Sequence, residues 1–364
     1  MNHMKSPQMI KEIFVLRSLG CIGIVLLHSI YIALSAHSPE ELGTVVYTLL
    51  DSLQVFLYYG TPMFVFISEF VISYSYRSRR LPGNFLQKRL KFIMIPYITM
   101  GLLYSIPFFQ LGVEFWGTKA LMNIFVGDYH GYFVLIIFQF YLVHYFFNSY
   151  LKRWSPRVVI SAALAVNVLY LAVFNYTAPP DFLPHGDYIW DRFFWVPMFG
   201  WVFYFVIGFY SGYYYESFID SLTKYRFVIF AGPLVSTAFL MFMYHSGILT
   251  EHSSKRIDIL LHTTAISLFL FYIMSFLPRP PRVLVFISRY SFGIFLFHYA
   301  FIFIMDYVYQ QFFPYDLLLM YIPVLFIFSL FSSIFVIFLL NKTPYGFLFV
   351  GKIGIPYDTG KKAA

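Results

Sequence analysis

Residues 13–34 read IFVLRSLGCIGIVLLHSIYIAL, an apolar run of 22 residues that is interrupted by Arg17 and His28. A helix needs roughly 20 apolar residues to cross the hydrocarbon core of a bilayer. The run therefore predicts a transmembrane helix. Basic residues precede it, as in a signal peptide, but no small-residue cleavage site follows, so we expect the helix to be retained. Cys21 is the single cysteine, which excludes an intrachain disulfide.

The rest of the chain repeats this pattern. It has 364 residues, of which 60% are hydrophobic and 12% charged, and its mean hydropathy is +0.70. Soluble domains carry about 25% charged residues, so the composition excludes an ordinary soluble enzyme and a disordered protein. We predict an all-α, polytopic membrane protein whose ten spans are residues 13–34, 45–75, 92–111, 129–151, 158–176, 194–215, 227–245, 258–277, 290–311 and 318–341. The second run is long enough to be tilted or to begin with an interfacial turn.

The basic residues predict the orientation of these spans. With the N-terminus in the cytoplasm, 21 of the 25 Lys and Arg residues fall in cytoplasmic segments and 4 in outside loops. Positively charged residues are favoured on the cytoplasmic side, so both termini are expected there. The net charge of +8 follows from this arrangement, and no nucleic-acid partner is expected. Residues 1–341 form the predicted membrane-embedded domain, and residues 342–364 a short cytoplasmic tail.

Two polar residues of the first span share one face. Arg17 and His28 are eleven residues apart, which in an α-helix is three turns plus about 20°, and about 16 Å along the axis. An arginine near the cytoplasmic boundary suits a phosphate or carboxylate. A histidine deeper on the same face suits proton transfer. The alternative is a snorkelling arginine and a histidine that is bonded to a neighbouring backbone.

Three further residues stand out because ionisable groups are costly inside a membrane. His298 lies about eight residues into the ninth span, and His130 lies at the outer start of the fourth. Either could be catalytic, could position the acceptor, or could be structural. Glu69 is the most deeply placed carboxylate. It could pair with Arg17, orient a histidine or be protonated, and a supporting role is expected.

A basic cluster follows the second span and consists of Arg77, Arg79, Arg80, Lys88, Arg89 and Lys91. The simplest interpretation is an anchor to lipid headgroups. The alternative is binding of a polyanionic cytosolic cofactor such as a nucleotide-bearing thioester, for which Lys88 and Arg89 together with Arg17 are the candidate residues. No metal site is predicted.

These residues resemble the acyltransferase 3 family of membrane proteins. Arg17, ten intervening residues and His28 look like its opening motif, residues 291–298 (SFGIFLFH) are similar to a late segment that ends in histidine, and residues 127–133 (GDYHGYF) resemble its His-x-Trp-Phe segment, with Tyr132 at the Trp position. Within the family, residues 60–64, 131–133, 199–205 and 208–216 are most similar to the intercellular adhesin polysaccharide (IcaC) type. The sequence departs from the family where Ser68-Glu69-Phe70 replaces a Ser-Gly-Phe segment.

The resemblance implies an O-acyltransferase that moves an acetyl or succinyl group from cytosolic acyl-CoA to a hydroxyl of a surface or exported polysaccharide. The candidate catalytic residues are His28, Arg17, His298 and His130. His28 is the first choice for the base, His298 or His130 would instead position the acceptor, and direct transfer and an acyl-histidine relay both stay open. The expected location is a bacterial cell membrane, with polysaccharide synthesis machinery as a partner. The alternative is an exporter of a polysaccharide or small molecule that uses the same buried polar residues as a pathway.

Overall fold

The computed structural model describes residues 10–312 and 318–354, and this part of the chain is helical, without strands. The elements, with η marking short 3₁₀ or π turns, are α1 (Lys11–Ala36), α2 (Pro39–Leu42), α3 (Thr44–Leu57), α4 (Gly60–Ser75), α5 (Phe85–Arg89), η1 (Leu90–Met94), α6 (Ile95–Ser105), η2 (Ile106–Leu111), α7 (Val113–Phe125), η3 (His130–Tyr132), α8 (Phe133–Leu151), α9 (Pro156–Tyr176), α10 (Gly186–Trp195), η4 (Met198–Gly200), α11 (Val202–Tyr213), α12 (Tyr215–Lys224), α13 (Arg226–His245), α14 (Ile259–Phe276), α15 (Arg282–Phe312), α16 (Leu318–Leu340) and α17 (Phe347–Val350).

Helices of membrane-spanning length make up most of the described chain. Nine stretches of the described residues are long and apolar enough to cross a bilayer: Lys11–Ala36, Thr44–Ser75, Phe85–Leu111, Val113–Leu151, Pro156–Tyr176, Arg226–His245, Ile259–Phe276, Arg282–Phe312 and Met320–Leu340. They correspond to nine of the ten predicted spans, which confirms the all-α multi-pass class. The predicted span 45–75 consists of two helices, α3 and α4, in succession. Placement of the termini in the cytoplasm stays a prediction.

The predicted span 194–215 differs most from the structure. Its helical part is α11, which has 12 residues and is therefore about 18 Å long, shorter than the hydrocarbon core. Pro197 lies just before it in an extended conformation, with φ −63° and ψ 141°. Proline has no backbone N–H and restricts the residue before it. The helix is therefore interrupted between α10 and η4.

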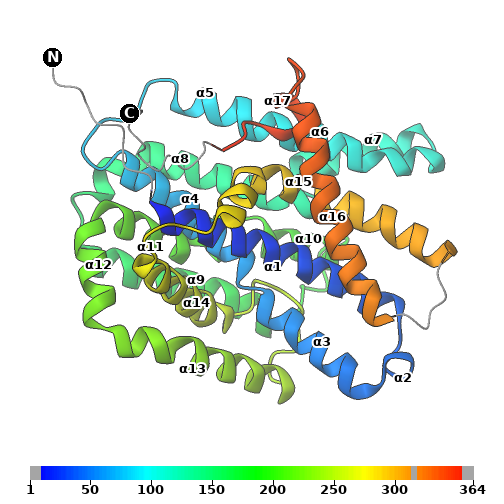
Figure 1. Cartoon of the computed structure of the whole chain (residues 1–364), viewed down its shortest axis with the longest axis horizontal. Helices are drawn as coiled ribbons and strands as arrows, with labels where there is room; N and C mark the ends of the chain where they lie inside the picture. The colour runs from blue at the N-terminus through cyan, green and yellow to red at the C-terminus, as the bar shows by residue number, and fades with distance from the viewer. Residues whose placement is uncertain (1–9, 313–317, 355–364) are drawn as a thin grey trace.

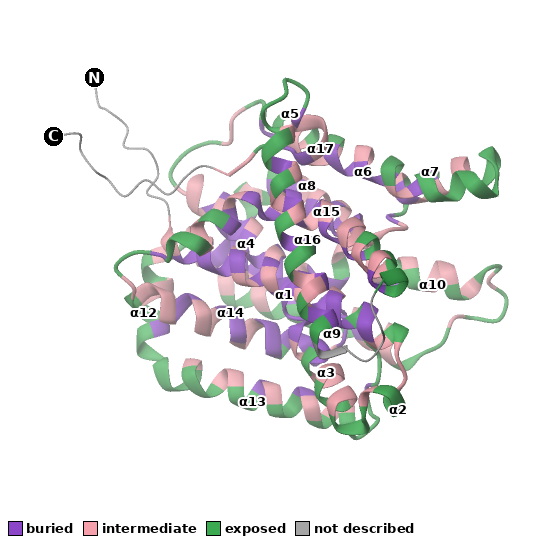
Figure 2. Cartoon of the chain, turned by 45° about the vertical axis from the view of Figure 1, so that its right-hand side comes forward, coloured by how far each residue is buried: buried purple, intermediate pink, exposed green. Residues whose placement is uncertain are grey.

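Helix α1 lies at the centre of the bundle (Figure 1), where it packs against α15, α4, α16, α3 and α14. Most of α1 and α4 is buried, whereas α13 is mostly exposed at the edge (Figure 2). A mostly apolar helix is buried by neighbouring helices on most of its sides. The face of α1 that carries Arg17 and His28 therefore has a defined set of neighbours.

The short helix α11 packs closely on α4 because two of its residues have no side chain. A Cβ atom at Gly208 would lie 2.6 Å from the carbonyl oxygen of Phe66, and one at Gly212 would lie 2.4 Å from that of Phe70. Small residues four apart allow two membrane helices to approach to backbone contact. This contact determines the position of α4, which forms part of the site described below.

The first part of the predicted tail also packs on the bundle. Helix α17 contacts α6, α15, α16 and η1. Beyond it, the backbone N–H of Gly354 donates to the carbonyl of Arg289 at 3.0 Å, and Nε of Arg289 donates back to the Gly354 carbonyl at 3.2 Å. Residues 351–354 are thereby held against the start of α15. The remainder of the predicted tail, 355–364, lies outside the described residues.

Candidate functional site

Two cavities adjoin the polar face of α1, one toward each of its ends. The Arg17 cavity, of about 460 Å³, includes Arg17 among its lining residues. The His28 cavity, of about 390 Å³, includes His28. Because α1 is one continuous helix, these two residues are about 16 Å apart along its axis. Both volumes fall within the range of ligand pockets, roughly 300–1,000 Å³.

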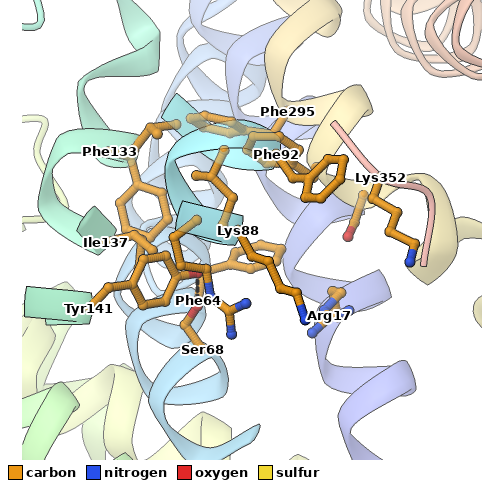
Figure 3. Close-up of a pocket in the computed structure, with 15 residues that line it drawn as sticks. Arg17, Phe64, Ser68, Lys88, Phe92, Phe133, Ile137, Tyr141, Phe295 and Lys352 are labelled. Carbon is orange, nitrogen blue, oxygen red and sulfur yellow. Dashed lines mark hydrogen bonds between the residues drawn. The ribbon is translucent and has the colours of Figure 1, made fainter. Parts of the chain in front are cut away.

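The Arg17 cavity combines an apolar wall with several cations. Figure 3 shows Phe133, Ile137 and Tyr141 of α8 along one side and Lys352 on the opposite side. The four cationic residues that line the cavity are Arg17, Lys88, Arg89 and Lys352. None of the described residues that line it is acidic. Such a surface suits an anion that carries an apolar or uncharged extension.

These cations have no ion-pair partners among the described residues. Within the described part of the chain, Arg17, Lys88 and Lys352 have neither an ion pair nor a side-chain hydrogen bond. The Arg89 guanidinium lies over the rings of Phe85 and Tyr141, with its carbon 4.5 and 5.2 Å from the ring centroids, and its buried Nε has no hydrogen-bond partner. The cavity therefore has unused donors for phosphate or carboxylate oxygens.

The structure divides the basic cluster of residues 77–91 into two groups. Lys88 and Arg89 line the Arg17 cavity, as the cofactor-binding alternative expects. Arg77 instead pairs with exposed Glu216 at 2.9 Å, and the Lys91 ammonium lies 4.9 Å from the ring centroid of Phe347. The sequence gives no signal for Lys352, because its position beside the cavity depends on how the segment after α17 folds back.

His28, His298 and His130 meet at the second cavity, although they come from α1, α15 and η3. Nδ1 of His28 lies 2.8 Å from Nε2 of His298. The ring centroids of His130 and His298 are 5.3 Å apart. The ring of Tyr299 stacks on His130 and contacts the edge of His28. His28 and His130 line the cavity, whereas His298 is fully buried behind them.

The hydrogen bonds determine which nitrogen atoms carry protons. Nδ1 of His298 faces the carbonyl oxygens of Ile294 and Phe295 at 3.0 and 2.8 Å. A carbonyl only accepts, so this nitrogen is the donor and Nε2 of a neutral His298 is an acceptor. Nδ1 of His28 then donates to it, which leaves the lone pair on Nε2 of His28. This tautomer is assigned from the hydrogen-bond partners.

His130 is oriented by the same stretch of backbone. Its Nε2 donates to the carbonyl of Phe295 at 3.1 Å, so Nδ1 is its acceptor atom. The side chain of Phe295 lines the Arg17 cavity, and its ring centroid lies 5.7 Å from that of His130. Phe295 therefore lies between the two cavities, with its ring on the Arg17 side and its carbonyl bonded to the histidines.

Glu69 lies away from the three histidines. Its Oε1 pairs with Nδ1 of His144 at 2.5 Å, and both side chains are buried. The structure thus gives neither a contact with Arg17 nor one with His28. Of the alternatives for Glu69, the structure matches the one in which it orients a histidine, but that histidine is His144 of α8. Its connection to the site is structural, since it joins α4 to α8, both of which line the Arg17 cavity.

Other residues of the His28 cavity were not predicted. They include Trp195 and Lys255, which follow no motif and come together because α10 and the segment before α14 both lie at this end of the bundle. In the described ranges, no group of three His, Cys, Asp or Glu side chains is placed to hold a metal ion.

Comparison of the sequence with known proteins identifies a family. The acyltransferase 3 family, described as an acyltransferase domain, matches residues 10–342. A Bacillus subtilis protein named "Putative membrane-bound acyltransferase YfiQ" is 37% identical over 352 residues, which cover 95% of this chain and 96% of that protein. A Staphylococcus aureus protein named "Probable poly-beta-1,6-N-acetyl-D-glucosamine export protein" is 29% identical over 65% of this chain and 66% of its own length.

A protein of the same name from Staphylococcus epidermidis is 26% identical over 65% of this chain and 64% of its own length. No solved structure matches the chain. The family match covers nearly all of the helical bundle and includes the Arg17 and His28 positions. The chain therefore belongs to the acyltransferase 3 family and is a multi-pass membrane acyltransferase of bacterial type.

Proposed function

We propose that the chain transfers an acyl group, acetyl or succinyl, from cytosolic acyl-CoA to a hydroxyl of an extracytoplasmic polysaccharide. The observation that carries this proposal is the pair of cavities on one face of α1. One is lined by cations that form no ion pair with a described residue, and the other by oriented histidines. The two cavities separate a polyanionic donor from a hydroxyl-bearing acceptor, with the reacting groups meeting between them.

The Arg17 cavity is the proposed donor site. Acyl-CoA carries phosphates at one end and an uncharged arm that ends in the thioester. Arg17, Lys88 and Arg89, together with Lys352, supply charge-assisted donors for the phosphates. The apolar wall formed by Phe133 and Ile137 suits the arm and the acyl group. The thioester would then point past Phe295 toward the histidines.

His28 is the proposed catalytic base. Its Nε2 carries a lone pair and belongs to a side chain that lines the cavity, so a sugar hydroxyl can donate its proton there. The hydroxyl oxygen attacks the thioester carbonyl carbon, a C–O bond forms and the C–S bond breaks. The proton on His28 then passes to the departing CoA sulfur. His298 acts through His28 as a positioning residue, because it is buried and lines neither cavity.

His130 is proposed to position the acceptor. It lines the cavity beside His28, and its Nδ1 is available to accept a hydrogen bond from a second sugar hydroxyl. An acyl-histidine relay through His28 uses the same groups in two steps. The bacterial surface glycan and, by analogy with the export proteins among the relatives, polysaccharide synthesis machinery are the proposed partners.

The test compares the wild type with His28→Ala in a host that makes the glycan. Ester-linked acyl groups per sugar should fall to background in the variant at equal membrane abundance. The matched control is His245→Ala, since His245 is an exposed histidine that lines neither cavity. Unchanged ester in His28→Ala would contradict the assignment of the base.

An exporter is the second candidate, and the printed name of the staphylococcal relatives favours it. An exporter moves the glycan unaltered, whereas an acyltransferase leaves an ester on it. The same samples therefore separate the two functions. Loss of exported glycan with an unchanged acyl content per sugar would support export and would refute the transfer mechanism.

A further inference from the structure

The His28 cavity contains a buried cation that the proposed mechanism does not use. Lys255 lines this cavity and only 4% of its surface is exposed. It comes from the segment just before α14. The backbone there is anchored on both sides: the N–H of Lys255 donates to the Ser253 hydroxyl at 3.2 Å, and the N–H of Ile257 donates to Oδ1 of Asn175 at 2.8 Å. The position of the side chain is therefore built into the fold.

The ammonium group of Lys255 lies against aromatic rings. Its Nζ is 4.2 Å from the ring centroid of Trp195 and 5.2 Å from that of Tyr132. Such cation–π contacts compensate part of the cost of burying a charge, but a ring face does not replace a hydrogen-bond acceptor. The Nζ atom has one such acceptor among the described residues, the Tyr132 hydroxyl at 3.4 Å. This distance is long for a hydrogen bond.

Unlike Lys255, the neighbouring cations form direct ion pairs with carboxylates. Arg192, which also lines the cavity, pairs with Asp128 at 3.6 Å. Arg256 is fully buried and pairs with Asp258 at 2.6 Å. No carboxylate of a described residue lies within ion-pairing distance of Lys255. Glu251 is near enough to interact electrostatically with Lys255 but forms no direct ion pair with it. A buried ammonium group without a directly paired carboxylate has donors left for a ligand.

The rest of the lining combines aromatic rings with neutral polar groups, which suits a sugar, and its acidic residue Asp128 is paired with Lys119 and Arg192. Trp195 and Tyr132 provide flat apolar surfaces, and their ring centroids are 5.6 Å apart. Ser253, Ser254 and Gln54 supply hydroxyl and amide groups. Small-ligand sites typically combine a mostly apolar lining with a few polar groups that fix orientation. Lys255 adds a charge to that arrangement.

We infer that the His28 cavity binds a sugar that carries an anionic substituent, a carboxylate or a phosphate, and that Lys255 recognises that substituent. This inference deepens the proposed function, on which it rests, by naming the class of acceptor. The anionic group occupies the free donors of the Lys255 ammonium, while the sugar ring lies against Trp195 and Tyr132. Lys255 is thus a specificity-determining residue, and His28 remains the base.

The test measures binding in the absence of acyl-CoA, so that its result does not depend on acyl transfer. The full chain in detergent micelles is titrated with glucose, glucuronic acid and glucose 6-phosphate, which differ only at carbon 6, and binding is followed by ligand-observed NMR. A charge-assisted hydrogen bond in a partly desolvated site should make at least one acidic sugar bind about tenfold tighter than glucose. The tighter of the two acids identifies carboxylate or phosphate as the substituent.

Three variants assign the preference to a residue. Lys255→Met should abolish the difference between acidic and neutral sugars, and Lys255→Arg should retain it, which also shows that the site tolerates substitution. Arg17→Gln tests whether the acidic sugars bind in the other, cationic cavity. Equal binding of all three sugars to the wild type, or a preference that survives Lys255→Met but is lost in Arg17→Gln, would overturn the inference. A failure of the proposed function would instead appear as absent ester in the host assay, with these binding results unaffected.

Discussion

The hydrogen bond between His28 and His298 allows a quantitative prediction for His298→Ala. The bond is 2.8 Å long, and the His298 side chain is fully buried and lines neither cavity. The substitution removes the acceptor for Nδ1–H of His28 and leaves that donor without its partner. Loss of a buried partner costs about 1–3 kcal/mol, and about 1.4 kcal/mol corresponds to a tenfold change in rate.

The expected result is a fall in kcat of roughly 5- to 150-fold, because the His28 ring loses its fixed orientation and tautomer. The KM for acyl-CoA should stay within about twofold, since the Arg17 cavity is unchanged. The assay is steady-state transfer of a radiolabelled acyl group from acyl-CoA to the glycan, in membranes with matched amounts of protein. Loss of an interaction that acts only on the chemical step lowers kcat and leaves ground-state binding intact.

His298→Gln is the matched control for this prediction. A glutamine can offer an oxygen to Nδ1–H of His28 and an N–H₂ group to the carbonyls of Ile294 and Phe295, so it should recover part of the lost rate. The reasoning would be refuted if His298→Ala raised the KM for acyl-CoA with kcat unchanged. It would also be refuted if the alanine and glutamine variants had equal rates.

Three further predictions concern the donor cavity and the bundle. Arg17→Gln should raise the KM for acyl-CoA about tenfold or more, because it removes a charge-assisted donor, whereas Arg77→Gln, which alters a pair with exposed Glu216, should leave KM unchanged in the same assay. Gly208→Ala should destabilise the protein by about 1–3 kcal/mol in detergent unfolding, because the added Cβ would lie 2.6 Å from a backbone oxygen of α4; Gly117→Ala, with nothing within 4 Å, should not destabilise it. Glu69→Ala should lower the unfolding midpoint by leaving a buried partner unpaired while the KM for acyl-CoA stays unchanged, and a large rise in that KM would show that Glu69 acts in donor binding.

Much of the fold followed from local sequence. The apolar runs specified an all-α membrane bundle because each span must satisfy its own backbone hydrogen bonds within the bilayer. The exception is residues 194–215, where hydropathy continued across Pro197 but the helix did not. A hydropathy count sums side-chain character and therefore does not register the missing N–H of a proline.

Part of the site also followed from local sequence. The eleven-residue spacing of Arg17 and His28 places them on one face of any straight α-helix, and the continuous helix α1 retains that relation. The sequence left two interpretations of Lys88 and Arg89, lipid-headgroup anchoring and binding of a polyanionic cofactor. Their position in the Arg17 cavity favours the second. In these cases the geometry depends on the helix itself or on a short stretch next to it.

Only the tertiary structure decided which residues share a cavity. The bond between His28 and His298 joins positions 270 residues apart, and Lys255, in the segment before α14, meets Trp195 at the end of α10. Likewise, Glu69 pairs with His144 and not with Arg17 because α4 packs against α8. Helix periodicity determines the face on which a residue lies, but side-chain packing between helices determines what that face meets. The sequence alone therefore determined the class of protein and one polar face, and the packing of the helices turned that face into two cavities.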